Sequence, residues 1–130
     1  MHERLRIVII GGNRLAAQLI TDFMSRSFVE VLAVADIFDD SPGALTARKL
    51  GIRFTNDIPG LNALAPDPDL VIDMAEWPGI EDDLRTAYPG ALGGNPTVIH
   101  DASARLVLSL AADSQDMGGL SALNLVAADC

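Results

Sequence analysis

The stretch RIVIIGGNRLAA, residues 6–17, decides the fold of this chain. A short run of mainly β-branched residues ends in two glycines, and apolar residues at helical spacing begin directly afterwards. A buried strand that turns into a helix at glycine is typical of a sheet whose strands run parallel and are covered on both faces. The free amide groups at the start of such a helix favour an anion such as a phosphate.

The same alternation of apolar strand and helix continues along the chain. Strands are expected at residues 6–10, 29–35, 52–54, 69–74 and 97–100. Helices are expected at 14–26, 42–50, from 57 as a brief helix, 78–88 and 102–112, with a Gly/Pro loop over 89–96. Ser41 before Pro42 predicts the start of the second helix, and Gly51 its end.

This pattern predicts an α/β fold. Helices between wholly apolar strands imply a doubly wound, parallel, five-stranded sheet in three layers, Rossmann-like, with the strand order 3-2-1-4-5. The domain is expected to span residues 1–112, and residues 113–130 to form a C-terminal tail or a connecting segment.

Composition limits the classes of partner. Hydrophobic residues make up 49% of the chain, charged residues 21%, and the formal net charge is −9. An acidic surface repels nucleic-acid backbones and anionic lipid, so neither nucleic acid nor a membrane is an expected partner. The single cysteine, Cys130, has no disulfide partner, and no signal peptide or apolar run of about 18 residues is seen. We therefore expect a cytoplasmic protein, and with so few histidines and cysteines no metal site.

The glycine turn aligns in part with the dinucleotide-binding pattern G-x-G-x-x-G/A. Gly11 permits the tight turn, and Ala16 is small enough for the helix to pack closely on the strand. Asn13 stands where a second glycine lets the backbone approach a pyrophosphate. Its side chain is expected to crowd the phosphates, although asparagine tolerates left-handed backbone geometry better than most residues.

Asp36 follows the second strand, 25 residues after Gly11. This is near the spacing at which a carboxylate binds the ribose hydroxyls of NAD, and its charge disfavours the 2′-phosphate of NADP. Because ligands bind at the carboxyl ends of the strands in such sheets, Gly11 and Asp36 are expected to lie side by side. The alternative is that both residues are purely structural, since glycine and aspartate are common where strands end.

Three segments carry a resemblance to a known family. They are IVIIGGNRLAAQLI (7–20), VLAVADIFDDSPGALTARKLGIRFTNDIPGL (31–61) and DPDLVIDMAE (67–76). They resemble the N-terminal NAD(P)-binding Rossmann domains of the glucose-fructose oxidoreductase and inositol dehydrogenase group, in which the order strand, acidic residue, small helix and K-L-G-I-x-x-x-x-D is typical. Domains of dihydrodipicolinate reductase and aspartate dehydrogenase are similar too. So are Rossmann modules attached to bacterial sensor histidine kinases, in which a strand like VIHDASARLVLSL closes the domain.

The resemblance covers about residues 4–112 and implies NAD as the cofactor. The residues that it places at cofactor-contacting positions are Gly11, Gly12, Asn13, Arg14, Leu15, Asp36, Ile37, Ala75, Glu76 and Trp77. The sequence also departs from the family. Members carry E-K-P after the fifth strand, with a catalytic lysine, where this chain has His100, Asp101 and Ala102. The second, substrate-binding domain of these members is not expected within the 18 residues after position 112, so no catalytic residue is assigned.

Other polar residues allow two interpretations each. Asp101 would orient the imidazole of His100, but adjacent strand residues point to opposite faces, so a capped strand end is preferred. Asp73 and Glu76 suggest an acid–base pair, and solvated carboxylates at the rim are the preferred interpretation. Trp77 either stacks on a ligand ring or covers apolar surface, and the second is preferred.

Three functions follow from these observations. We favour a non-catalytic sensory or regulatory module that binds a nucleotide-like small molecule, such as NAD, and that forms a homodimer or is attached to a signalling partner. The second is the cofactor-binding part of a truncated or partner-dependent NAD-dependent oxidoreductase. The third is a dimerisation or interaction domain that has lost its ligand, which Asn13 and the apolar residues 120–128 suggest.

Overall fold

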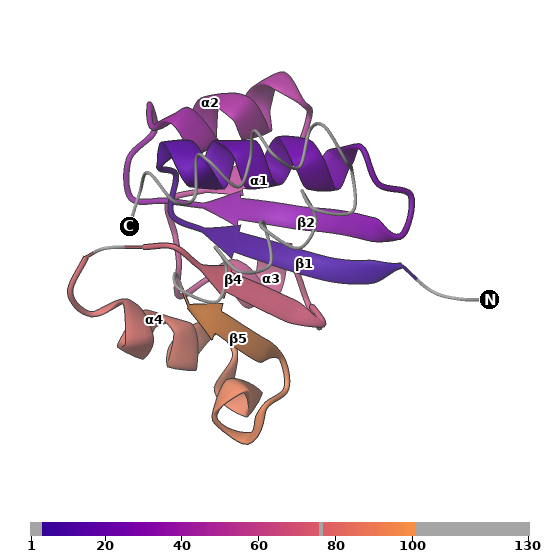
Figure 1. The fold of residues 1–130 in the computed structure, drawn as a ribbon. Coiled ribbons are helices and arrows are strands. Elements are labelled where there is room, and N and C mark those ends of the chain that lie inside the picture. The colour runs from indigo at the N-terminus through magenta and orange to yellow at the C-terminus, as the bar shows by residue number, and fades with distance from the viewer. Residues whose placement is uncertain (1–3, 76, 101–130) are drawn as a thin grey trace.

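Five parallel strands form the central layer in the computed structural model, which describes residues 4–75 and 77–100 (Figure 1). The strands are β1 (Leu5–Ile10), β2 (Val29–Ala35), β3 (Phe54–Thr55), β4 (Leu70–Asp73) and β5 (Thr97–His100). The helices are α1 (Arg14–Met24), α2 (Pro42–Lys49), α3 (Leu61–Leu64), α4 (Ile80–Ala87) and the 3-10 helix η1 (Pro89–Gly93). The strand order is β3-β2-β1-β4-β5, which confirms the predicted doubly wound α/β fold.

Both faces of the sheet are covered by helices. Ile7 and Ile9 of β1 pack into a cluster with α1 and α2, whereas Val8 and Ile10 pack into a second cluster with α3 and α4. This double burial explains why the strand is apolar at consecutive positions instead of alternate ones. Each buried aliphatic side chain of this size contributes about 1.5–3 kcal/mol through removal from water.

Helix α1 lies on the sheet through the face that carries Leu15, Leu19 and Phe23. It ends at Met24, two residues before the predicted end. The reason is that the amides of Ser25 and Arg26 bond three residues back, to Asp22 and Phe23, which tightens the last turn.

The segments around β3 differ from the prediction. Ile52 was expected in the strand, but its amide donates to the carbonyl of Ala47, which holds it at the end of α2, and β3 pairs with β2 only at Phe54 and Thr55. The following helix begins at Leu61 and not at Asp57, whose carboxylate instead accepts from the amide of Gly60 in the preceding turn.

The segments after β4 also differ in part from the prediction. The expected loop over 89–96 contains the short helix η1, and α4 begins at residue 80 after Gly79, which has a φ of 86°. The predicted helix 102–112 and the segment 113–130 lie outside the described residues. Within the described ranges, no helix combines the length and hydropathy that a membrane crossing requires.

Candidate functional site

The carboxyl ends of the central strands bring the predicted site together. Ile10 is level with Ala35 of β2 and with Asp73 of β4 in the sheet register. The amide of Gly11 donates to the carbonyl of Ala35 at 2.8 Å, and the amide of Met74 donates to Ile10 at 2.8 Å. The glycine turn, the residue after β2 and the loop after β4 therefore start at one edge of the sheet.

Gly11 is required at the turn for two reasons. Its φ is 96°, in the left-handed region that side chains with a Cβ rarely adopt. A Cβ at this position would also lie 2.7 Å from the backbone carbon of Met74. The prediction that Gly11 permits the tight turn is confirmed, and the structure adds the close approach of β4.

Gly12 is the point where three segments meet. A Cβ here would overlap the Oγ atom of Ser41 and the Oδ2 atom of Asp36. The carbonyl of Gly12 accepts a hydrogen bond from the amide of Gly43 at 2.7 Å, so the start of α2 is attached directly to the glycine turn. Gly43 is itself restricted, because a Cβ there would lie 2.7 Å from the Cα atom of Gly12.

Asn13 begins the first helix. Its backbone is extended, with φ −68° and ψ 178°, so this position does not need the left-handed geometry that asparagine tolerates. It is the N-cap of α1, and its Oδ1 atom accepts from the amide of Ala16 at 2.8 Å. Asparagine is among the preferred N-cap residues because its side chain satisfies an amide that the helix leaves free. That amide is one of those that a glycine turn offers to a phosphate.

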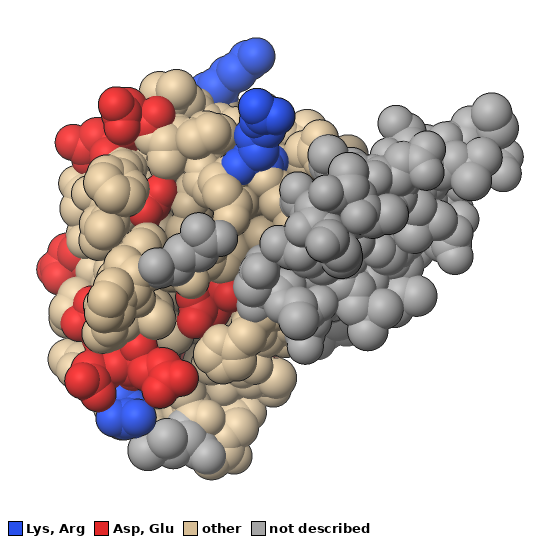
Figure 2. Space-filling model, turned by 60° about the vertical axis from the view of Figure 1, so that its left-hand side comes forward, with Lys and Arg blue, Asp and Glu red and all other residues tan. Residues whose placement is uncertain are grey.

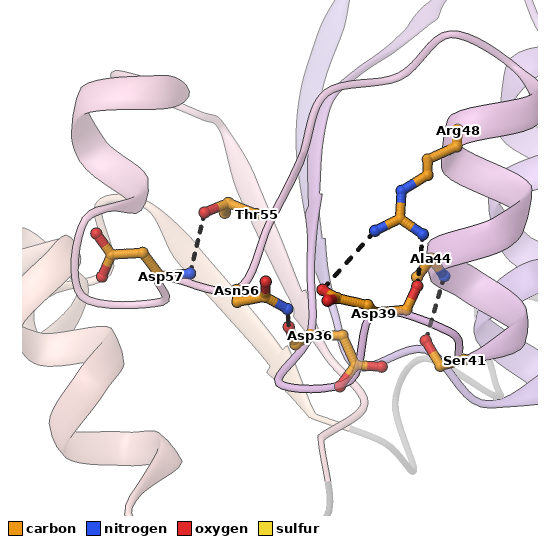
Figure 3. A network of polar contacts seen from close by, with 8 residues as sticks. All are labelled: Asp36, Asp39, Ser41, Ala44, Arg48, Thr55, Asn56 and Asp57. Carbon is orange, nitrogen blue, oxygen red and sulfur yellow. Dashed lines mark hydrogen bonds and ion pairs between the residues drawn. The ribbon is translucent and has the colours of Figure 1, made fainter.

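Asp36 is buried, with 2% of its surface exposed. The backbone around it is held by hydrogen bonds. Its amide donates to the carbonyl of Thr55 at 3.1 Å. Its carbonyl accepts from Nδ2 of Asn56 at 2.8 Å (Figure 3). Within residues 4–75 and 77–100, no group donates a hydrogen bond to its carboxylate. The carboxylate lies beside Gly12 and borders a hollow at the edge of the sheet.

The hollow has a volume of about 190 Å³. The residues that line it are Gly11, Gly12, Asn13, Asp36, Phe38, Ser41, Pro42, Met74, Ala75 and Trp77. Six of the predicted contact residues are among them. Of the remaining four, Arg14 is exposed at the first position of α1, Leu15 packs in the core, Ile37 is exposed beside Asp36, and Glu76 lies outside the described residues.

Four lining residues are absent from the predicted contact residues, namely Phe38, Ser41, Pro42 and Met74. Ser41 and Pro42 carried a signal for the start of α2, which is confirmed: Ser41 Oγ accepts from the amide of Ala44 at 3.2 Å. Only four residues separate Asp36 from this cap, a length that keeps the start of α2 close to the glycine turn. That short connection was the available sequence signal.

Trp77 contributes an apolar wall. It packs, partly buried, against the cluster formed with α3 and α4, which confirms the expectation that it covers apolar surface. It also lines the hollow. Its Nε1 atom is buried and makes no hydrogen bond within the described part of the chain, an arrangement that costs free energy.

Asp73 and His100 form a pair that the sequence did not predict. They are partners in the register of β4 and β5, and Nδ1 of His100 lies 3.2 Å from Oδ2 of Asp73. The other oxygen of Asp73 accepts from the amide of Ala75 at 3.0 Å. Asp73 is only 5% exposed, so the interpretation as a solvated carboxylate is wrong. Burial raises its pKa, and the Ala75 amide and His100 oppose this rise. Asp101, the partner considered from sequence, lies outside the described residues.

Acidic side chains gather at this edge of the molecule. Figure 2 turns forward the side at which the strands end in Figure 1, and carboxylates are spread across it. They come from the loop after β2, with Asp39 and Asp40, and from the first turn of α4, with residues 81–83. Arg48 is engaged by Asp39, as Figure 3 shows. Among the described residues, no group of three or more histidines, cysteines or carboxylates is arranged to hold a metal ion.

Solved structures share this fold. GenD2 from gentamicin A biosynthesis, in complex with NAD, is 20% identical with a TM-score of 0.55, and the match covers 94% of this chain and 33% of GenD2. Apo scyllo-inositol dehydrogenase from Lactobacillus casei is 16% identical with a TM-score of 0.53, and the match covers 86% of this chain and 34% of the dehydrogenase. The chain thus spans about a third of the length of either protein. No protein-family model matches the sequence, and neither does any curated protein. At these identities the likeness shows the Rossmann-like fold.

Proposed function

We propose that the chain is a Rossmann-type binding module that holds a nucleotide-like ligand, with NAD as a candidate, in the hollow between the glycine turn and Asp36. Its role would be sensory or regulatory, without catalysis. The observation that carries the proposal is the carboxylate of Asp36, which is buried beside Gly12, borders the hollow and receives no hydrogen bond from the described residues.

A buried carboxylate without hydrogen-bond donors is costly. The two adjacent hydroxyls of a ribose supply two donors at a spacing that suits the two oxygens of one carboxylate. Gly12 leaves room for this approach, because any side chain there would occupy the space beside Asp36. The negative charge of Asp36 would repel a 2′-phosphate, so NADP is the weaker candidate.

The non-catalytic role is supported by the place of the only lysine. Lys49 lies in the last turn of α2, whose first turn is the one that adjoins the hollow. It is therefore distant from the site at which the resemblance would require a catalytic lysine. Homodimer formation and attachment to a signalling partner stay predictions.

The proposal is tested by titration with NAD, NADH, ADP and coenzyme A. The single tryptophan, Trp77, lines the hollow, so its fluorescence reports occupancy there, and calorimetry gives an independent affinity. We expect at least one ligand to bind below about millimolar Kd. Asp36→Asn is expected to weaken that binding by about tenfold or more, the usual effect of a lost hydrogen bond to a charged group.

Asp67→Asn is the matched control, because it removes the same charge from an exposed loop before β4, at the opposite edge of the sheet. Asp67 has a φ of 53°, which asparagine tolerates. An absence of binding by all four ligands and by the nucleoside adenosine, or equal binding by wild type and Asp36→Asn, would overturn the proposal.

The pair of Asp73 and His100 favours a second candidate, part of an NAD-dependent oxidoreductase. A buried carboxylate that holds one nitrogen of an exposed imidazole leaves the other nitrogen available for proton transfer. The test is NADH oxidation with a panel of aldehydes and ketones. Under this candidate, His100→Ala abolishes turnover while NADH binding is retained. No turnover with any carbonyl compound would exclude an oxidoreductase that acts without a partner subunit.

A further inference from the structure

We infer that the hollow accepts a nucleoside whose 5′ substituent carries no negative charge, in preference to nucleoside phosphates and dinucleotides. This inference rests on the proposed function, since it uses the same hollow and the same contact of Asp36 with a ribose. The charges and the helix starts around the hollow indicate this class of ligand.

At the starts of α1 and α2, beside the hollow, amides that a phosphate would use already donate hydrogen bonds within the chain. In α1, Oδ1 of Asn13 accepts from the amide of Ala16 at 2.8 Å. In α2, Oγ of Ser41 accepts from the amide of Ala44 at 3.2 Å, and the amide of Gly43 donates to Gly12. Anion binding at a helix start depends on such amides being free. Here the chain itself takes one amide in α1 and two in α2.

The charges around the hollow are unfavourable to a phosphate. Asp36 is one of the lining residues, and Asp39 and Asp40 lie in the short segment between the lining residues Phe38 and Ser41. A phosphate near these carboxylates would be repelled, and the repulsion between like charges is stronger where the dielectric constant is low. A dinucleotide would add two further negative charges beside these carboxylates.

The cations near the site do not offset this acidity. Arg48 makes its ion pair with Asp39 at 3.8 Å and also donates to the carbonyl of Asp39. Arg85 pairs with Asp82 at 2.9 Å. Arg14, next to the lining residue Asn13, is exposed to solvent, which screens its charge. One exposed guanidinium thus faces several carboxylates.

Size and lining point in the same direction. The hollow of about 190 Å³ is smaller than the roughly 300–1,000 Å³ of pockets that enclose a drug-sized ligand. Two of its walls are aromatic, from Phe38 and Trp77, and aromatic faces suit a nucleobase. A ribose would donate hydrogen bonds to Asp36, and its base would lie against these aromatic rings. A neutral or cationic 5′ group would avoid repulsion by the carboxylates.

The test compares adenosine, AMP, ADP and NAD by Trp77 fluorescence and calorimetry at low and high NaCl concentration, with uridine and guanosine and their phosphates as parallel series. Affinity is expected to fall with each added phosphate, with adenosine or another nucleoside binding about tenfold or more tightly than its diphosphate. Salt is expected to improve binding of the diphosphate by screening repulsion and to leave binding of the nucleoside unchanged.

Two variants sharpen the test. Asn13→Gly removes the side chain and frees the Ala16 amide, and glycine is an acceptable N-cap. Asp40→Asn removes a charge that forms no ion pair within the described ranges. Each is expected to raise affinity for ADP several-fold, with the nucleoside changed less, whereas Asp67→Asn is expected to change neither.

The outcomes separate the two proposals. Equal or tighter binding of ADP or NAD than of the nucleoside, or diphosphate affinity that falls as salt increases, overturns this inference and leaves the proposed function standing. Absence of binding by every compound overturns both. Tighter nucleoside binding with the stated salt dependence supports both.

Discussion

At the scale of single residues, Gly12 connects the three segments that build the hollow. Its Cα atom lies against Ser41, Asp36 and Gly43, and its carbonyl accepts from Gly43. Two of these neighbours are side chains that depend on its lack of a Cβ. The hollow and the packing of α2 on the glycine turn therefore both depend on the absence of a side chain at Gly12.

Gly12→Ala is expected to lower the free energy of unfolding by about 1–3 kcal/mol, the usual cost of overpacking, because the new methyl group would displace Ser41 and Asp36. Urea unfolding measures this change. Gly93→Ala is the control, since a Cβ there has no neighbour within 4 Å. Equal stability of the two variants would contradict the assignment of Gly12 as a packing point.

At the scale of elements, β4 and β5 hold Asp73 and His100 in register. Burial raises the pKa of Asp73, so the folded protein binds this proton more tightly than the unfolded chain does. The contribution of Asp73 to stability is therefore fully present below its ordinary pKa of 3.8 and is lost as the pH rises through the folded value.

Asp73→Asn retains an acceptor for the Ala75 amide and removes this titration. Its free energy of unfolding, relative to wild type, is expected to increase between about pH 4 and pH 7. Urea unfolding across this range measures the difference. Because His100 contacts the carboxylate of Asp73, the same comparison is made with His100→Gln in both proteins. A difference that is constant or decreases with pH would contradict the prediction.

The ends of α3 and α4 are linked through Tyr88, the only tyrosine of the chain. Its hydroxyl donates to the carbonyl of Ala65 at 2.8 Å, and burial raises its pKa from 10.0 to about 12. The contribution of the neutral phenol to stability is thus present below pH 10 and is lost as the pH rises through about 12.

Absorbance of the phenolate is expected to appear near pH 12 in the folded protein and near pH 10 in urea. Tyr88→Phe is expected to lower the free energy of unfolding by about 1 kcal/mol, since the Ala65 carbonyl loses its donor. A phenol that titrates near pH 10 without urea would show that this hydroxyl is not buried.

At the scale of the whole molecule, the formal net charge of −9 and the acidic edge of the sheet imply self-repulsion. The free energy of unfolding is expected to rise as NaCl is increased from about 0.02 to 0.5 M, because screening shortens the range of this repulsion. Urea unfolding at each concentration measures it. Asp40→Asn combined with Glu81→Gln is expected to reduce the rise, and a fall in stability with salt would contradict the prediction.

The strand order and the meeting of Gly11 with Asp36 were predictable because they depend on local patterns. Strands buried on both faces are apolar at consecutive positions, and parallel strands end at one edge. The starts of β3 and α3 were not predictable. The amide of Ile52 bonds to the end of α2, and Asp57 bonds within the turn before α3, so these residues join neither the strand nor the helix. Asp73 was wrongly interpreted as solvated because its surroundings include β5, whose place beside β4 the local sequence does not show.

The sequence by itself determined the doubly wound sheet and the edge at which its glycine turn and acidic residue lie, since hydrophobic periodicity and glycine positions act over a few residues. Only the tertiary structure decided that Ser41 and Gly43 pack against Gly12 and that Asp73 faces His100. Side-chain contacts between distant segments depend on the paths of the loops and on packing at the sheet edge, and these arise only when all the layers are assembled.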